Sequence, residues 1–365
     1  MNQSAGNYIK HADSDKTDFV FYTFIPRPLE EGNFFQIDDE LSDLLIDAYH
    51  ALGVLDGSVK YAPNKASFAD LSLFMECCYS RLIDYQTPLL YNALKGEDTD
   101  YITNIASAYR YSDGKAISMP VLSSVFEIAL SDADRGEKVS FRKKQTFMLR
   151  AVTNLKVYNP TSPEGILPAM KDIMAYLRKI DFPEVLTKAA LAHYQFETIH
   201  PFEYYNGIVG RVLIFMILRA TGLKAPCFMS LSEFLYNNKN EYFDIISSTQ
   251  RSGSHIRWIK FMIRGIIEAA NQAVIRLDKY EKLIEHSEAI ILSGKILTKN
   301  NVKVYNCFKR RLVSQIKPIA EELSVSFNTV SKSIDLLVNE GILRAEKDQS
   351  RHRYFVYDTA VDVFM

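Results

Sequence analysis

A histidine, an asparagine–glycine pair and an arginine lie within twelve residues of one another near the middle of the chain. They are His200, Asn206-Gly207 and Arg211, in the stretch HPFEYYNGIVGR. An imidazole can accept a proton at neutral pH, and a guanidinium can bind a phosphate through two parallel hydrogen bonds. A helix that starts at Asn206-Gly207 presents free backbone N–H groups to the same anion. The spacing therefore indicates a site for phosphoryl or nucleotidyl transfer.

Two apolar segments must position these residues. Segments 186–196 and 208–221 both read as helices, and the second is so apolar that we expect it to be largely buried. Arg211 lies in the first turns of the second helix, and helix side chains lean toward the N-terminus, so its guanidinium can reach the loop. Each residue alone has a simpler explanation as a cap, a turn or an ion pair. Their order within one short stretch favours chemistry.

The same stretch resembles the signature of the Fic family, H-P-F-x-[D/E]-G-N-G-[K/R]-x-x-R. The chain also supplies the flanking residues of that signature, Ala192-His193, Gln195-Phe196-Glu197 and Ile199. Most Fic proteins of this kind transfer AMP from ATP to a hydroxyl side chain of a target protein. The resemblance implies that His200 is the catalytic base. It also implies that the nucleotide is bound by Asn206, Gly207, Gly210 and Arg211.

Three positions depart from the family signature. Tyr204 replaces the acid that holds Mg²⁺, Tyr205 replaces a glycine, and Ile208 replaces the first arginine. A phenol is a poor ligand for a hard cation, and a tyrosine is not expected to adopt a positive φ as glycine does. The intact part of the signature implies ATP, with Mg²⁺ if the protein is active. We assign no metal ligand.

A second resemblance lies upstream, in a helix expected over residues 66–84. Many Fic proteins carry an inhibitory helix with the pattern [S/T]-x-x-x-E-[G/N], whose glutamate pairs with the last arginine of the signature. Ser80 and Asp84 stand at the corresponding positions. The resemblance implies that Asp84 pairs with Arg211 and blocks the placement of the γ-phosphate of ATP. From the residues alone, Asp84 fits equally well as the solvent-facing end of a helix.

Two further segments resemble parts of the family's binding site. Tyr158, Asn159 and Pro160 match a β-hairpin flap that holds the backbone of a target protein by strand addition. Leu149-Arg150 and Asn154 belong to the same resemblance. In a helix expected over residues 231–247, Tyr242 takes the place of an aromatic residue that borders the adenine pocket, whereas Phe243 reads as core.

Composition sets the outer limits. The chain has 365 residues and 47% hydrophobic content, enough for two or three domains with their own cores. Its net charge of −1 provides no overall field that would draw it to nucleic acid or to a membrane. The four cysteines show no metal or disulfide spacing, and no apolar run reaches the ~18 residues of a membrane span. We expect a cytoplasmic protein without a membrane partner.

The C-terminal region is similar to a winged helix-turn-helix, the usual neighbour of Fic domains in bacterial regulators. Residues 316–323 and 327–339 read as two short helices, the second capped by Ser326, and a β-hairpin follows. Such a module either contacts DNA or serves dimerisation and protein docking. The basic residues available for DNA are Lys332 on the second helix and Arg344, Lys347, Arg351 and Arg353 in the wing.

The sequence therefore predicts a mainly α fold built around a Fic-type helical core with a small β-hairpin flap. We expect an N-terminal helical extension with the inhibitory helix at 1–110, the Fic core at 111–285 and a winged helix-turn-helix tail at 286–365. Residues 1–18 should be loose, and 19–26 should form a strand or strap. Helices are expected at 38–53, 100–111, 119–130, 166–180 and 256–280.

Two functions stay open. The first is ATP-dependent adenylylation of a hydroxyl on an unidentified target protein, weakened and self-inhibited. The second is a catalytically degenerate Fic scaffold that acts as a signalling protein or a DNA-binding transcriptional regulator. The resemblance to the Fic family implies that the protein forms a homodimer. The sequence fixes neither the nucleotide donor nor the target.

Overall fold

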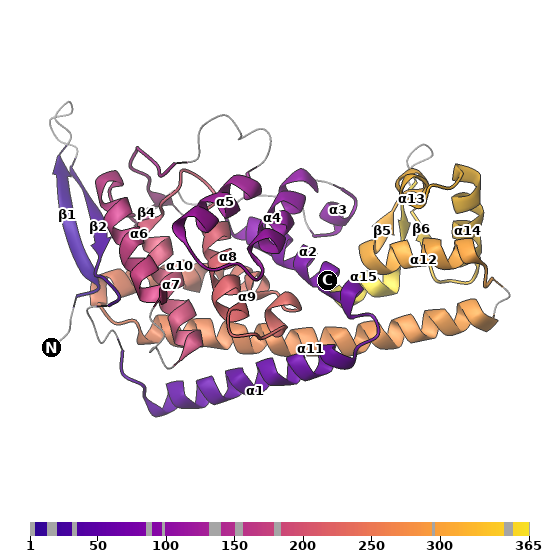
Figure 1. Cartoon of the computed structure of the whole chain (residues 1–365), viewed down its shortest axis with the longest axis horizontal. Coiled ribbons are helices and arrows are strands. Elements are labelled where there is room, and N and C mark those ends of the chain that lie inside the picture. Colours follow the sequence, from indigo (N-terminus) through magenta and orange to yellow (C-terminus); the bar gives the residue numbers. More distant parts are fainter. Residues whose placement is uncertain are drawn as a thin grey trace.

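The computed structural model describes residues 4–12, 20–30, 35–84, 90–96, 99–130, 140–149, 156–178, 184–293, 296–346 and 353–364. Within these ranges the chain is mainly helical and carries three small antiparallel sheets, which confirms the predicted fold class. Figure 1 shows an elongated molecule with a large helical body at one end and a smaller C-terminal lobe at the other. One long helix, α11, runs beneath both.

The elements follow the chain in a simple order. The N-terminal hairpin and the helical body consist of β1 (Gly6–Ala12), β2 (Val20–Pro26), α1 (Asp39–Tyr61), α2 (Lys65–Asp84), α3 (Leu90–Leu94), α4 (Thr99–Ser112), α5 (Met119–Ala129), β3 (Met148–Leu149), β4 (Lys156–Tyr158), α6 (Pro163–Arg178), α7 (Val185–Ile199), α8 (Asn206–Arg219), η2 (Ala225–Cys227), α9 (Leu231–Asn237), α10 (Lys239–Ser252) and α11 (Ile256–Ser293). The C-terminal lobe consists of α12 (Lys299–Arg311), β5 (Val313–Ser314), α13 (Ile316–Leu323), α14 (Phe327–Asn339), β6 (Arg344–Ala345), β7 (Phe355–Val356) and α15 (Asp358–Phe364).

The centre of the body is the antiparallel pair α7 and α8. Almost every residue of both helices is buried, as their apolar sequences predict. Helix α7 begins at Glu184, whose carboxylate accepts a hydrogen bond from the N–H of Leu186 at 2.8 Å. Helix α7 is longer than the expected 186–196 by one residue at its start and three at its end. Helix α8 begins and ends two residues earlier than the expected 208–221. Together they bring the loop at residues 200–205 to one end of the pair.

The N-terminal hairpin corrects one expectation and confirms another. Strand β2 forms where a strand was predicted, but residues 6–12 are not loose. They form β1, which pairs antiparallel with β2 from Gly6 opposite Pro26 to Ala12 opposite Val20. The polar composition of residues 6–12 gave no sign of this pairing, because its partner strand supplies the β-forming aromatic residues.

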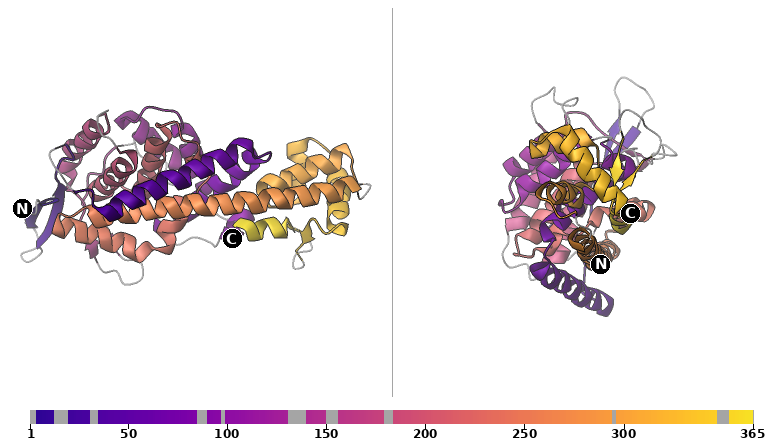
Figure 2. Two further views of the ribbon diagram at one scale, coloured as in Figure 1. Left: turned by 90° about the horizontal axis from the view of Figure 1, so that it is seen from below. Right: turned by 90° about the vertical axis from the view of Figure 1, so that its right-hand side faces the viewer.

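Helices α1 and α11 lie side by side along the molecule (Figure 2). The start of α1 is capped by Asp38, which accepts a hydrogen bond from Leu41 N at 2.8 Å. We predicted that this helix ends near Gly53, and that prediction was wrong. The helix continues for two more turns because Leu55 and Val59 bury their side chains on the same face as Leu41.

The segment 231–247 is not one helix but two, which corrects a second expectation. Asn238 separates α9 from α10, and both its backbone N–H and its side-chain amide donate to Phe234 O, at 3.0 and 2.9 Å. When an asparagine side chain donates to a backbone carbonyl at the end of a helix, that hydrogen bond competes with those that would continue the helix. The break allows α10 to turn toward the end of α2.

The described part of the C-terminal lobe contains four helices, α12 to α15, and a three-stranded sheet with the order β5-β7-β6. Ser326 accepts a hydrogen bond from Thr329 N at 3.2 Å and so caps α14 as predicted. The elements follow one another in the order expected of a winged helix-turn-helix, and the assignment itself stays a prediction. Helix α15 returns to the body, where Phe364 packs at 5.7 Å from the rings of both Phe68 and Tyr280.

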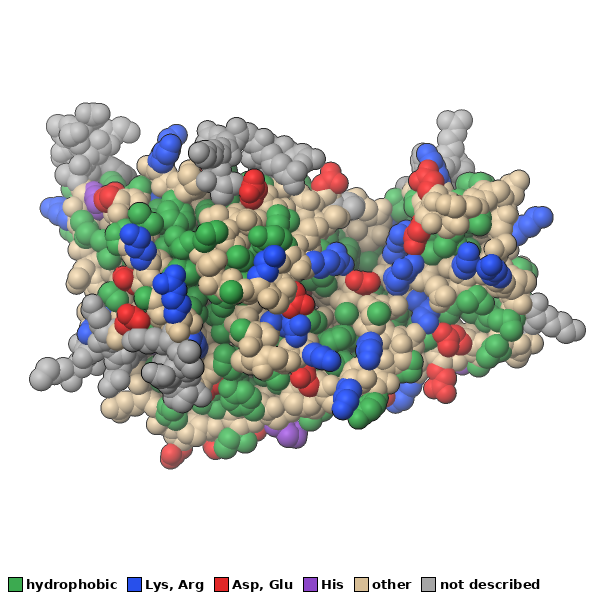
Figure 3. Space-filling model, in the orientation of Figure 1, with side chains coloured by type: hydrophobic (Ala, Val, Ile, Leu, Met, Phe, Trp, Pro, Cys, Tyr) green, Lys and Arg blue, Asp and Glu red, His purple; other side chains and the backbone are tan. Residues whose placement is uncertain are grey.

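The outer surface shows no large region of one charge on the face in Figure 3, where basic and acidic side chains are interspersed. None of the helices described here combines the length and the apolar character that crossing a membrane requires.

Candidate functional site

The loop between α7 and α8 is held by two residues in the left-handed conformation. His200 ends α7 with φ 52° and ψ 63°, and Tyr205 precedes α8 with φ 59° and ψ 17°. This conformation costs an L-residue roughly 1–2 kcal/mol. We expected that a tyrosine would not replace a glycine here, and Tyr205 does so. Such strain is typical of functional loops, where the surrounding structure fixes the backbone.

Asn206 closes this loop rather than facing outward. Its Oδ1 accepts a hydrogen bond from Phe202 N, and its Nδ2 donates to Phe202 O, both at 2.8 Å. The ring of Phe202 stacks on Phe126 with 4.3 Å between centroids. The side chain of Asn206 therefore shapes the loop, and the binding of an anion would fall to the backbone N–H groups at the start of α8.

Arg211 is bound by two residues of α2. Its Nε donates to Ser80 Oγ at 2.8 Å, and its Nη2 donates to Ser80 O and to Asp84 Oδ2, both at 2.7 Å. The Arg211 side chain is 1% exposed and that of Asp84 is 19% exposed. Burial alone would lower the pKa of Arg211, but the nearby Asp84 raises it overall, so the guanidinium keeps its charge.

The carboxylate of Asp84 also covers the first turn of α8. A Cβ placed on Gly207 would lie 2.8 Å from Asp84 Oδ1 and 2.8 Å from Arg211 Nη1, and closer still to Asp84 Oδ2. The absence of a side chain at Gly207 is thus what lets an anion reach this helix start. A negative group is stabilised there by the helix dipole and the free N–H groups. In this structure the anion at that position is a carboxylate of the same chain.

Glu76 fastens α2 in this position. Its carboxylate is buried and accepts hydrogen bonds from Tyr109 Oη at 2.8 Å, from Ser230 Oγ at 3.1 Å and from Ser232 N at 2.9 Å. Glu76, Ser80 and Asp84 are spaced by four residues and therefore share one face of the helix. The sequence analysis did not single out Glu76, since nothing local distinguishes a buried glutamate from a solvated one.

His200 lies at the other lip of the loop. Its side chain is 13% exposed, and its Nδ1 is 3.8 Å from Glu197 Oε2. Burial, aided by the nearby charge of Arg142, lowers the pKa of His200 to about 3. The imidazole is therefore neutral at physiological pH, and a neutral imidazole is the form that accepts a proton.

Arg142 holds the end of α7 and was missed by the sequence analysis. Its Nε donates to His200 O at 2.7 Å, and its Nη2 donates to Ile199 O at 3.2 Å and to Thr161 O. Burial lowers the pKa of Arg142 to about 10, so it keeps its charge at pH 7. A cation on the last carbonyls of a helix stabilises that helix end. In the sequence Arg142 is one of many charged residues in a connecting segment.

A buried polar cluster lies behind His200 and Arg211. Glu197 is 2% exposed, and burial together with the charge of Asp84 raises its pKa to about 8. A Cβ on Gly210 would lie 3.0 Å from Glu197 Oε1 and 2.9 Å from His193 Nδ1. Gly210 therefore serves the close approach of α7 and α8, a role different from the nucleotide contact that the resemblance implies.

Tyr242 belongs to the same cluster. It is 1% exposed, its Oη lies 2.9 Å from His193 Nε2, and its ring packs against Trp258. The resemblance placed this tyrosine beside the adenine of a nucleotide. In the structure, its ring faces other side chains, so direct contact with a base would require the side chains around it to move.

The predicted flap is present as a short hairpin. Strands β3 and β4 pair antiparallel, with Met148 opposite Tyr158. Tyr158 Oη donates to Glu197 O at 3.2 Å, Asn159 Nδ2 donates to the carbonyl of Tyr22 in β2, and Pro160 O accepts from Gln145. The hairpin thus lies between α7 and the N-terminal sheet. Arg150 and Asn154 lie outside the described residues.

Within residues 200–205 the one carboxylate is that of Glu203, beside Tyr204, which stands in the place of the family's metal-binding acid. Tyr204 is 52% exposed and its Oη lies 3.5 Å from Glu203 Oε1, while Ile208 is fully buried in the core. Among the residues that the structure describes, no group of three or more acidic, histidine or cysteine side chains is placed to hold a metal ion.

Comparison with known proteins agrees with this geometry. Residues 126–218 match the model of the Fic/DOC family. The chain is 29% identical over 108 residues to the protein adenylyltransferase fic-1 of Caenorhabditis elegans, a match that covers 29% of this chain and 20% of that protein. It is 24% identical over 195 residues to a probable protein adenylyltransferase of Aquifex aeolicus, covering 53% of this chain and 55% of the relative. The matches thus span about a fifth and about half of the relatives' lengths.

Solved structures share the fold at low sequence identity. A Fic family protein from Desulfovibrio desulfuricans superposes with a TM-score of 0.57 at 14% identity, covering 88% of this chain and 97% of that one. A Fic-domain signalling protein from Bacteroides thetaiotaomicron gives a TM-score of 0.50 at 15% identity, covering 64% and 98%. The fold and the loop between α7 and α8 define a Fic-type domain. Residues 126–218 are therefore similar to a Fic/DOC domain in both sequence and fold.

Proposed function

We propose that this protein is a nucleotidyltransferase that moves AMP from ATP to a hydroxyl of a target protein, and that α2 holds it in an inhibited state. The observation that carries the proposal is the carboxylate of Asp84. It sits over Gly207 and binds Arg211, the two groups suited to hold a phosphate. A site built for an anion and filled by an internal anion is the expected form of a self-inhibited phosphate site.

The chemistry follows from the groups around the loop. Neutral His200 takes the proton of the target hydroxyl, whose oxygen attacks the α-phosphorus of ATP. A new phosphorus–oxygen bond forms, the bond to the β-phosphate oxygen breaks, and pyrophosphate leaves. The N–H groups at the start of α8 and the guanidinium of Arg211 bind the phosphates and stabilise their charge. Tyr158, Asn159 and Pro160 lie beside this site, where the flap would hold the target.

The regulator hypothesis rests on a different observation, the absence of a carboxylate at Tyr204 and of a cation at Ile208. Exposed Tyr204 does not fill the start of α8, since Asp84 covers it. Contact with DNA gains no specific support among the described residues of the lobe. Arg344 is bound to Asp358 at 2.8 Å, and exposed Lys332 on α14 has exposed Asp335 three residues away. Lys347 and Arg351 lie outside the described residues.

The transfer reaction is testable with ATP labelled in the α-phosphate. Purified Asp84→Ala protein is incubated with labelled ATP and Mg²⁺, and AMP attached to protein is measured by its mass shift and by label. We expect at least tenfold more label than with the native chain, because Arg211 and the start of α8 become available.

The control is His200→Ala in the Asp84→Ala background. It should abolish the label while leaving ATP binding in place. Label that survives in this double variant would contradict the role of His200. Absence of label in Asp84→Ala protein that binds ATP would favour the regulator.

A further inference from the structure

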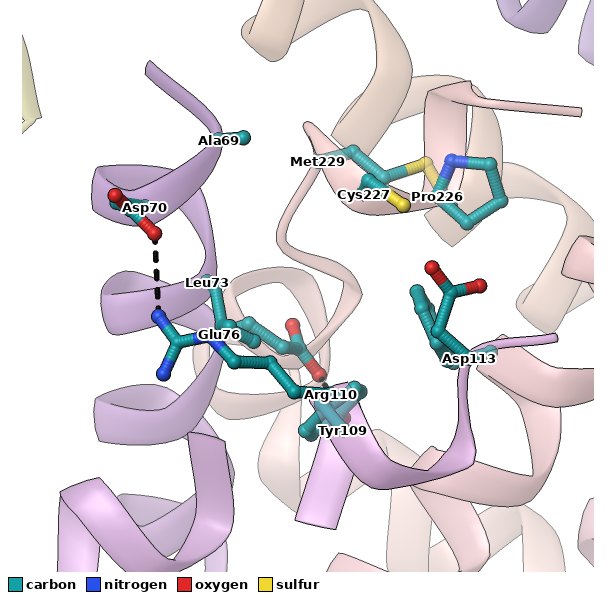
Figure 4. Close-up of a pocket in the computed structure, with 11 residues that line it drawn as sticks. Ala69, Asp70, Leu73, Glu76, Tyr109, Arg110, Asp113, Pro226, Cys227 and Met229 are labelled. Atoms are coloured by element: carbon teal, nitrogen blue, oxygen red, sulfur yellow. Dashed lines mark hydrogen bonds and ion pairs between the residues drawn. The ribbon is translucent and has the colours of Figure 1, made fainter. Parts of the chain in front are cut away.

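A second hollow in the body lies away from the loop at residues 200–205. It has a volume of about 190 Å³ and lies between α2, α4, α8 and η2. Its walls are mainly apolar and include Leu73, Phe215, Pro226 and Met229. Figure 4 shows α2 on one side of it and η2 on the other. Neither the proposed transfer reaction nor the family resemblance uses this space.

The volume and the walls set the size of an occupant. An apolar cavity of about 150 Å³ accommodates a benzene molecule, so this one accommodates a single ring with a short chain. A separate, smaller hollow of about 20 Å³ shares Glu76, Tyr109 and Phe215 with it and is also lined by Arg211 and Leu231. The occupant is therefore a small molecule rather than a peptide or a nucleotide.

The charged residues of the lining set the chemical class. Three carboxylates face the cavity, from Asp70, Glu76 and Asp113, against one guanidinium, from Arg110. Even when the neighbouring Arg219 is counted, carboxylates outnumber guanidinium groups by three to two. Such a lining disfavours an anionic ligand and favours a cation or a neutral hydrogen-bond donor.

The positions of the carboxylates decide where a cation would lie. Glu76 is already satisfied by its hydrogen bonds from Tyr109, Ser230 and Ser232. Asp70 and Arg110 pair with each other at 3.1 Å at one edge. On the opposite side, the carboxylate of Asp113 faces Pro226 and Cys227 (Figure 4). Arg219 donates to both of its oxygens, from Nε to Oδ1 at 2.7 Å and from Nη2 to Oδ2 at 3.3 Å, and 38% of the Asp113 side chain stays exposed.

We propose that this cavity is a binding site for a small aromatic amine. The ring lies between Leu73, Phe215 and Met229, and the ammonium group lies at the mouth, beside Asp113. Because α2 is one wall of the cavity and also carries Ser80 and Asp84, an occupant contacts the helix that covers Arg211. The lining includes none of His200, Gly207 and Asp84, so the site does not depend on the proposed nucleotidyl transfer.

The first test uses phenethylamine, one ring with a two-carbon chain and an amine, and the full-length protein. Calorimetric titration should show saturable binding of one molecule per chain. The matched anion, 3-phenylpropionate, should bind at least tenfold more weakly. The amine class is overturned if the two probes bind equally, and the site is overturned if phenethylamine does not bind.

A pair of variants on α2 locates the binding. Ala69 lines the cavity, so Ala69→Phe fills it, whereas Ala66→Phe adds the same ring to an exposed position one turn earlier. We expect Ala69→Phe to weaken binding at least tenfold and Ala66→Phe to leave it unchanged. Equal binding by both variants contradicts the location. If Ala69→Phe fails to fold, Cys227→Phe fills the cavity from the opposite wall.

The rate at which Cys227 is alkylated gives an independent measure of whether the amine occupies the cavity. It lines the cavity and is partly exposed, whereas the other three cysteines of the chain are buried. Iodoacetamide should therefore modify Cys227 before the other cysteines, and mass spectrometry measures the rate of that modification. Phenethylamine at ten times its dissociation constant should slow that reaction about tenfold, by simple occupancy. Binding without protection of Cys227 places the amine elsewhere and overturns the proposal.

Discussion

At the scale of single residues, the site depends on carboxylates whose charge is set by their surroundings. Asp84 accepts a hydrogen bond from Arg211 at 2.7 Å and raises the pKa of that guanidinium. Glu197, one helical turn before His200, is buried, and the pKa of its carboxyl is raised to about 8. At pH 7 Glu197 is therefore mostly protonated, and His200 does not face a second negative charge.

The raised pKa of Glu197 predicts a pH-dependent stability. The folded state holds this proton more tightly than the unfolded state, where the pKa is about 4.3. The stabilisation is complete at low pH and is lost as the pH rises toward 8, at up to roughly 1.4 kcal/mol per unit. Glu197→Gln has no proton to lose, so its advantage over the native protein should grow from pH 5 to pH 8.

Urea unfolding at pH 5, 6, 7 and 8 measures this difference. The contributions of His193 and His200 are present in both proteins and cancel. A constant difference between the two proteins over this range would show that Glu197 is ionised in the folded state.

The sequence predicted the residues of the loop better than the residues that support it. His200, Gly207 and Arg211 share one short stretch, and order along the chain is enough to find them. Arg142 and Glu76 act through tertiary contacts with carbonyls and hydroxyls from distant segments. No local pattern separates such a buried charge from a solvated one, which is why both were missed.

At the scale of elements, the apolar pattern of a segment predicted its helix well, whereas a single glycine did not predict where a helix ends. The apolar patterns of α7 and α8 predicted two buried helices with small errors at their ends. Gly53 did not end α1, because burial of Leu55 and Val59 outweighs the low helix propensity of one glycine. Strand β1 has few β-forming residues of its own and forms by pairing with β2, the next strand along the chain.

The glycines of α1 predict a stabilising change. A Cβ added at Gly53 or Gly57 would meet nothing within 4 Å, and both residues lie inside the helix. Replacement by alanine should therefore raise the free energy of unfolding by about 0.5–1 kcal/mol at each position. The matched control is Gly265→Ala in α11, where the new Cβ would lie 2.6 Å from the Phe234 ring and should destabilise. Thermal and urea unfolding of the three variants check the signs.

At the scale of the whole molecule, the C-terminal lobe contacts α2, the helix whose Ser80 and Asp84 bind Arg211. The ring of Phe364 in α15 contacts Phe68 of α2 and Tyr280 of α11. Lys95 pairs with Glu346 at 2.7 Å, and Tyr354 donates to Lys95 O at 2.8 Å. The lobe and the body therefore share buried contacts, and α2 lies on their common side. The expected boundaries at 110 and 285 stay predictions.

Because Phe364 of α15 packs on the body, its replacement should destabilise the protein more than replacement of an exposed residue of the C-terminal lobe. Phe364 is buried between two helices of the body, so Phe364→Ala should lower the free energy of unfolding by about 3 kcal/mol. Phe327→Ala, at an exposed phenylalanine of α14, should change it by less than about 0.5 kcal/mol. Equal effects in urea unfolding would mean that α15 does not pack on the body.

The central claim is that the carboxylate of Asp84 occupies the place of a phosphate. Calorimetric titration of ATP with Mg²⁺ into native, Asp84→Ala and Asp84→Asn proteins tests it most directly, with Asp47→Ala as a control for loss of an exposed carboxylate. We predict weak binding by the native protein, at least tenfold tighter binding by both Asp84 variants, and no change in the control. Equal affinity of the native protein and the Asp84 variants, or no binding by any of them, would contradict the account.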